Sequence, residues 1–233
     1  MNRPGLGDGI TVSVLVLALL FLASTFEARA TSFSTTCAMP KGSYQRSGST
    51  YDFTLKNGDV GGCPTDGKAR HGAPYWERAE LRSANLRSGR TYDITFEVNF
   101  DPKTSSSSRT SFFQIHTYNN ACKECAPALM LRVHGGRVIA SVFGKGARSV
   151  EKSLGVGRSG ISGRWAKFRV LATTNTGQMN KVEVWIDGKK RLTSQSMYIA
   201  PKGRPYLKIG LYRPGNRSGL PVDRMSIRRI DAR

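Results

Sequence analysis

Three short segments of the sequence carry charged or proton-transferring side chains at alternating positions. They are Arg78-Ala79-Glu80-Leu81-Arg82, Gln114-Ile115-His116 and Lys208-Ile209-Gly210-Leu211-Tyr212. On an extended strand, residues two or four apart lie on the same face, so each segment would present its polar side chains to one side. An Arg, a Gln, a Lys, a His and a Tyr gathered on one surface could bind a carboxylate and move a proton beside it.

The surrounding sequence predicts the strands that must position these groups. Apolar and polar residues alternate from Tyr92 to Phe100, and again from Val182 to Ile186, just before the hairpin dipeptide Asp187-Gly188. Further strands are expected at Leu129–His134, Arg137–Phe143, Lys167–Ala172, Leu207–Tyr212 and Met225–Ile230. No stretch after residue 30 keeps a helical period for three turns. These features predict an all-β fold, a two-sheet antiparallel β-sandwich of the jelly-roll (concanavalin-like) kind with a concave substrate groove.

Strand parity also assigns faces within residues 111–118. It predicts that Phe113 and Ile115 point into the core, and that the outward face carries Phe112, Gln114, His116 and Tyr118. An isolated His116 would more often be a structural histidine. Three polar faces whose residue types suit one reaction favour a catalytic role for it.

Residues 1–30 are expected to be a secretory signal peptide. Arg3 precedes an apolar run from Ile10 to Ala23, and Ala28-Arg29-Ala30 offers the small residues that signal peptidase recognises. Cleavage after Ala30 would leave residues 31–233 as a single domain in a secreted or periplasmic protein. An uncleaved membrane anchor is the alternative, although the apolar run is shorter than the roughly 20 residues that span a bilayer.

The chain is strongly basic, with 36 Lys and Arg against 16 Asp and Glu and a net charge of +20. Residues 1–30 hold two residues of each sign, so the net charge is unchanged without them. Such a charge attracts polyanions, among them nucleic acid, membrane surfaces and acidic polysaccharides. Export and the lack of a nucleic-acid-binding motif argue against nucleic acid. We expect a monomer that has no stable membrane association after signal cleavage.

Four cysteines in an exported protein favour disulfides. Of the three possible pairings, Cys37–Cys63 with Cys122–Cys125 is the most local. Cys122-Lys-Glu-Cys125 could instead be a redox motif or half of a zinc site, but no second Cys pair or His pair accompanies it. The three histidines are far apart and no acidic calcium loop is visible, so no metal and no cofactor are expected.

Taken in order, Arg-x-Glu-Leu-Arg, Gln-Ile-His and Tyr-x-Lys-x-Gly-x-Tyr resemble the three signature strands of the alginate-lyase-like polysaccharide lyases. This group of jelly-roll enzymes is similar to the glucuronan lyases and heparin lyase I. The resemblance runs from Arg78 to Tyr212, which is most of the chain after residue 30. It implies cleavage of an anionic uronic-acid polysaccharide by β-elimination.

The resemblance also implies roles for individual residues. Arg78 and Gln114 match the positions that hold the substrate carboxylate, whose charge must be neutralised before the C5 proton can leave. His116 and Tyr212 match the proton-transfer pair, with Tyr212 as general acid to the departing O4. Either could take the C5 proton, Tyr212 only if cationic neighbours lower the pKa of its phenol. The remaining members of the predicted substrate-binding set are Glu80, which would fix the arginines, and Arg82, Lys208 and Arg213.

Some positions depart from the alginate-lyase pattern. Leu207 and Ile209 stand where those enzymes typically have Phe and Ala, and Ala79 and Arg213 also differ. The Lys208-Ile-Gly-Leu-Tyr-Arg213 form resembles the glucuronan and heparin lyase branch, so a glucuronate-containing polymer is at least as well supported as alginate.

Two other functions are open at this point. A glycoside hydrolase would need two carboxylates beside the bond, and the predicted groove offers Glu80 without a clear partner. A non-catalytic module for acidic polysaccharide could use Tyr75 and Trp76 as stacking platforms, but would not need the paired His116 and Tyr212.

Overall fold

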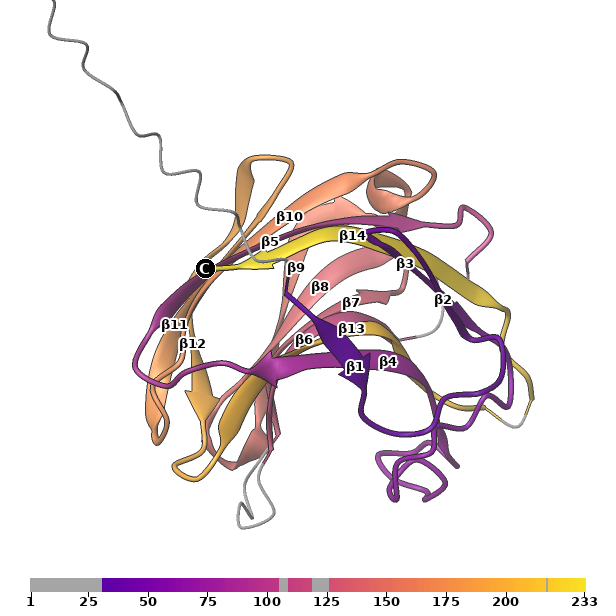
Figure 1. Ribbon diagram of the computed structural model, residues 1–233, viewed down its shortest axis with the longest axis horizontal. Coiled ribbons are helices and arrows are strands. Elements are labelled where there is room, and N and C mark those ends of the chain that lie inside the picture. The colour runs from indigo at the N-terminus through magenta and orange to yellow at the C-terminus, as the bar shows by residue number, and fades with distance from the viewer. Residues whose placement is uncertain (1–30, 105–108, 119–125, 217) are drawn as a thin grey trace, which may run out of the picture.

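Two curved antiparallel sheets packed face to face form the protein (Figure 1). This computed structural model describes residues 31–104, 109–118, 126–216 and 218–233. The first sheet, here called the groove sheet, contains in spatial order β1 (Phe33–Thr35), β4 (Trp76–Asn85), β13 (Arg204–Pro214), β6 (Thr110–Tyr118), β7 (Pro127–His134), β8 (Arg137–Phe143) and β9 (Ser149–Gly157). The second, the back sheet, contains β12 (Lys189–Ile199), β11 (Gln178–Ile186), β10 (Ala166–Thr173), β5 (Thr91–Phe100), β14 (Asp223–Ala232), β3 (Thr50–Leu55) and β2 (Tyr44–Ser47).

The β-sandwich expected from the sequence is confirmed, and each predicted strand lies within an observed one. The strand predicted at Tyr92–Phe100 is β5, and Arg137–Phe143 has the bounds of β8. Asp187 and Gly188 both have positive φ, at 49° and 76°, which is the backbone that a two-residue hairpin turn needs. Helical structure in the described residues is limited to the 3₁₀ turns Lys145–Ala147 and Arg158–Ile161.

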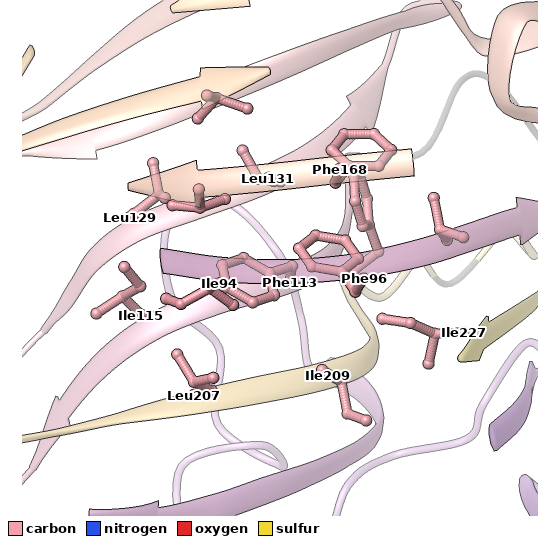
Figure 2. Close-up of a cluster of buried hydrophobic side chains, with 14 of the residues drawn as sticks. Ile94, Phe96, Phe113, Ile115, Leu129, Leu131, Phe168, Leu207, Ile209 and Ile227 are labelled. Atoms are coloured by element: carbon pink, nitrogen blue, oxygen red, sulfur yellow. The ribbon is translucent and has the colours of Figure 1, made fainter. Parts of the chain in front are cut away.

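Apolar side chains from both sheets fill the space between them (Figure 2). The aromatic centre is Phe96, which stacks on Phe113 with ring centroids 4.7 Å apart and on Phe168 at 5.2 Å. Phe96 and Phe168 belong to the back sheet and Phe113 to the groove sheet, so the Phe96–Phe113 contact joins the two layers. Burial of such large apolar surfaces is the main force that holds the sandwich closed.

The prediction that Phe112 points outward is wrong. Phe112 is buried and packs edge-on against Phe100 and Phe168. The cause is a register irregularity between Ser111 and Phe113 in the pairing with β7, so two successive phenylalanines face the core. Ser111 is thereby directed to the groove, where it lies on the same face as Gln114.

Cys37 and Cys63 form the predicted disulfide, with their Cα atoms 5.1 Å apart. The predicted Cys122–Cys125 bridge and the predicted signal peptide lie outside the described residues. Among the residues described, the structure has no helix long and apolar enough to span a membrane.

The close approach of β13 to β4 requires a glycine at position 210. It has a φ of 124°, and a Cβ at this position would lie 2.1 Å from the carbonyl oxygen of Ala79. Gly210→Ala is therefore expected to lower the free energy of unfolding by at least about 2 kcal/mol, measured by urea denaturation. In the control Gly67→Ala, the added Cβ meets nothing within 4 Å and the φ is not strained. Equal stabilities of the two variants would contradict this account.

Candidate active site

The motif residues of β4, β13 and β6 meet on the open face of the groove sheet. Tyr212 of β13 pairs with Arg78 on one side and with Ser111 on the other, while Lys208 pairs with Gln114. A cavity of about 390 Å³ lies over these strands. The predicted site residues that line it are Arg78, Gln114, His116, Lys208 and Tyr212.

The Glu80 carboxylate links three neighbouring strands at the floor of this cavity. It accepts hydrogen bonds from Arg78 Nη1 and from Gln114 Nε2, and Lys208 Nζ lies 3.3 Å from its Oε2. Gly210 stands directly opposite Glu80 on β13, and its lack of a side chain lets the two strand backbones approach closely there. All four polar side chains are buried. Of the two arginines that Glu80 was expected to fix, Arg78 contacts it, whereas Arg82 donates to Asn85 Oδ1 at 2.7 Å.

A loop between β3 and β4 supplies a second buried carboxylate. Asp66 accepts two hydrogen bonds from Arg78, one from Nε and one from Nη2, both at 2.8 Å. The disulfide tethers this loop at Cys63, whose backbone N–H donates to Asp66 Oδ2 at 3.3 Å. Arg78 thus gives three of its five N–H groups to Asp66 and Glu80 and keeps two. Both carboxylates raise the pKa of Arg78 against the effect of burial.

Tyr212 lies within a stack of aromatic and cationic groups. Its ring stacks on Trp76 at 4.9 Å, the Arg78 guanidinium lies 4.2 Å from the ring centroid, and Arg70 Nη2 donates to its hydroxyl at 2.5 Å. Burial raises the pKa of Tyr212 to about 12, although Arg78 and Arg70 oppose this rise. The cationic neighbours therefore do not lower this pKa below its usual value, and the phenol is protonated at neutral pH. It is suited to donate a proton.

His116 is suited to accept a proton. Burial, and next the charge of Lys208, hold the pKa of His116 well below 6.5, so the imidazole is neutral. Its Nδ1 lies 3.3 Å from the Tyr206 hydroxyl, and the two rings stack at 5.4 Å. These contacts fix the orientation of the ring. Burial also lowers the pKa of Lys208, with the Glu80 carboxylate acting in the opposite direction.

Arg82 and Arg213 are placed differently from the rest of the predicted set. Arg82 does not line the cavity, and its guanidinium lies over the Tyr206 ring at 3.9 Å. Arg213 as a substrate contact is wrong: it follows Tyr212, so it points to the opposite face, and it is fully buried. There it pairs with Glu77 at 2.5 Å and with Asp223 at 2.9 Å.

The departures from the alginate-lyase pattern also lie on the inward face. Ala79 on β4 and Leu207 and Ile209 on β13 are fully buried in the core, and Arg213 near the end of β13 is fully buried as well. Their side chains therefore face the core and do not line the groove.

Sequence reasoning missed several residues of the site. Asp66 and Arg70 come from an irregular loop that has no period to predict their positions. Tyr206 is the first residue of the Tyr-x-Lys-x-Gly-x-Tyr motif, but the motif alone predicted no role for it. Arg132 could have been found, because strand parity within the predicted strand Leu129–His134 places it outward. Among the described residues, no group of three or more His, Cys, Asp or Glu side chains is arranged to hold a metal ion.

Glu80→Gln tests the floor of the site. The variant removes the negative charge that pairs with Lys208 and that neutralises Arg78 together with Asp66. A buried charge without a partner lowers the stability of the folded protein. We expect the free energy of unfolding to fall by about 3 kcal/mol or more in urea denaturation. Asp93→Asn is the matched control, because Asp93 pairs with Arg169 at the surface and should cost about 1 kcal/mol or less. Similar losses in both variants would show that Glu80 does not organise the site.

Comparisons with known proteins place the chain among enzymes. A family model described as polysaccharide lyase matches residues 40–224. An endo-β-1,4-glucuronan lyase from the fungus Trichoderma reesei shares the fold at 11% identity and a TM-score of 0.60, with 88% of this chain and 90% of that one covered. No curated protein sequence matches the chain significantly.

Two alginate lyases have the same fold. The one from Pseudomonas aeruginosa is 19% identical with a TM-score of 0.56, covering 83% of this chain and 86% of that one. The one from Corynebacterium sp. is 16% identical with a TM-score of 0.55, covering 83% and 82%. The resemblance inferred from the three motifs is confirmed. Of the alternatives left open by the sequence, the family match supports an enzyme and not a non-catalytic binding module. Because the family match spans most of the sequence and all three motif segments, the chain belongs to the polysaccharide lyase family.

Proposed function

We propose that this lyase acts outside the cytoplasm and cleaves a glucuronan-, alginate- or heparin-like uronic-acid polymer by β-elimination. The observation that carries the proposal is one cavity lined by a neutral His116 and a protonated Tyr212, with Arg78, Gln114 and Lys208 between them. The Cys37–Cys63 disulfide supports export, because such bonds persist in oxidising compartments.

The substrate carboxylate is held first. The two N–H groups of Arg78 that Asp66 and Glu80 leave, the second N–H of Gln114 and the Lys208 ammonium all face it in this scheme. They stabilise the extra negative charge that develops on the carboxylate as the C5 proton departs. Because these donors are already fixed by buried carboxylates, little reorganisation is needed in the transition state.

His116 and Tyr212 then move the protons. The neutral imidazole takes the C5 proton, the electron pair of that bond forms the C4–C5 double bond, and the C4–O4 bond breaks. Tyr212 donates its phenolic proton to O4, and the hydrogen bond from Arg70 stabilises the phenolate that results. Exchange with solvent returns the proton from His116 to Tyr212.

A polymer screen tests this function. The protein without residues 1–30, incubated with polyglucuronate, alginate and heparin-type polymers, should produce the ultraviolet absorbance of a new C4–C5 double bond with at least one. On that polymer, His116→Ala and Tyr212→Phe should each lower kcat by about 100-fold or more, with little change in affinity. Tyr198→Phe, which removes a phenol from the back sheet, is the matched control. Full turnover in Tyr212→Phe would refute the proton-transfer assignment.

The pH dependence of kcat/KM tests the role of His116 separately. Its pKa in the folded protein is below 6.5, so the active neutral form is retained as the pH falls through 6.5. We expect the acidic limb of the kcat/KM profile to lie below pH 6.5, and Tyr212 to cause no loss at neutral pH. The unfolded chain binds this proton at higher pH than the folded protein, so His116 also lowers stability as the pH drops below 6.5. An acidic limb above pH 6.5 would contradict the assignment.

A further inference from the structure

Arg132 lies in the same row across the groove sheet as the proposed general acid. It pairs with Ser111 on β6, and Ser111 pairs with Tyr212 on β13. Two strand spacings of about 4.8 Å therefore separate the backbones at Arg132 and Tyr212, roughly 10 Å in all. Arg109, Ser111 and Arg132 line the same cavity as Tyr212.

The cationic charge of Arg132 is poorly balanced. Its side chain is only 12% exposed, yet the nearest carboxylate oxygen, on Glu151, is 3.5 Å away and also contacts Arg109. Its other partners are neutral: the Ser111 hydroxyl at 3.1 Å and the Met130 sulfur at 2.7 Å. Burial, and then repulsion by Arg109, lower the pKa of Arg132 to about 10.

Other buried arginines of the molecule have more negative charge around them. Arg78 contacts the carboxylates of Asp66 and Glu80, and Arg213 those of Glu77 and Asp223. Arg132 shares one half-exposed carboxylate with a second arginine, inside the cavity where a polyanion would bind. An arriving anion would supply the missing charge, and the planar guanidinium suits a carboxylate or a sulfate.

We propose that Arg132 and Arg109 form a second anion subsite, which binds a carboxylate or sulfate on a sugar next to the one that is cleaved. This inference rests on the proposed function. Arg78, Gln114 and Lys208 hold the carboxylate of the reacting uronate in this scheme, whereas Arg132 lies on β7, three strands from Arg78 and two from Lys208. The subsite makes a charged neighbouring sugar part of substrate recognition.

The test measures KM and kcat on the polymer that the screen identifies. Arg132→Gln and Arg109→Gln should each raise KM about tenfold or more, because a hydrogen-bonded charge pair is lost, with kcat within about twofold. Glu151→Gln should leave KM unchanged or lower it, because it removes the carboxylate that competes with the substrate. Arg164→Gln is the matched control: it removes the same charge from a pair with Asp187 outside the cavity.

The outcomes separate the subsite from simpler explanations. An unchanged KM in both Arg132→Gln and Arg109→Gln overturns the proposal, and so does a Glu151→Gln variant that binds as weakly as Arg132→Gln. Arg109 is 42% exposed, so its variant tests the subsite even if Arg132→Gln fails to fold. Comparing a non-sulfated polyuronate with a sulfated heparin-type polymer shows which anion is bound.

The same design distinguishes failure of the subsite from failure of the proposed function. If the wild-type protein cleaves none of the polymers, the proposed function fails. The dissociation constants of the wild type and Arg132→Gln, measured by calorimetry on each polymer, then test the subsite without any turnover. A tenfold weaker affinity in Arg132→Gln supports the subsite, and equal affinities overturn it.

Discussion

The arrangement of the candidate active site depends on one buried carboxylate. Glu80 accepts hydrogen bonds from Arg78 on its own strand and from Gln114 two strands away, and it also pairs with Lys208 on the strand between. Three strands therefore have to be in register for these contacts to form together. The missing side chain at Gly210 allows this arrangement, because a Cβ there would meet the backbone of Ala79 and Glu80 on β4.

The same carboxylates explain how a buried site can hold so many cations. Charges removed from water are costly unless they are paired and hydrogen-bonded. Asp66 and Glu80 neutralise Arg78, and the disulfide at Cys63 restrains the loop that carries Asp66. At the floor of the groove, the carboxylates of Asp66 and Glu80 thus alternate with the cationic groups of Arg78 and Lys208. The donors of the groove are fixed before substrate arrives, which is what stabilisation of a developing anion requires.

Strand parity predicted much of this site from the sequence, and it failed where the backbone departs from a regular strand. It placed Gln114 and His116 outward correctly, but a register irregularity turned Phe112 inward. Asp66 and Arg70 could not be predicted, since loop residues reach the site through the fold and not through a period. Arg213 was assigned to the groove although its own parity, one residue after Tyr212, places it in the core.

Parity also limits where substrate specificity can reside. Differences between this sequence and alginate lyases at Leu207 and Ile209 change the packing between the sheets and leave the groove surface untouched. Discrimination among polymers requires side chains that the polymer contacts, and on the strands these are the outward residues. Beyond the motif strands, the outward face of β7 contributes Arg132, and the loop before β4 contributes Arg70. Related lyases with different substrates should therefore differ at such positions more than at the buried ones, because only the outward positions affect the energy of binding.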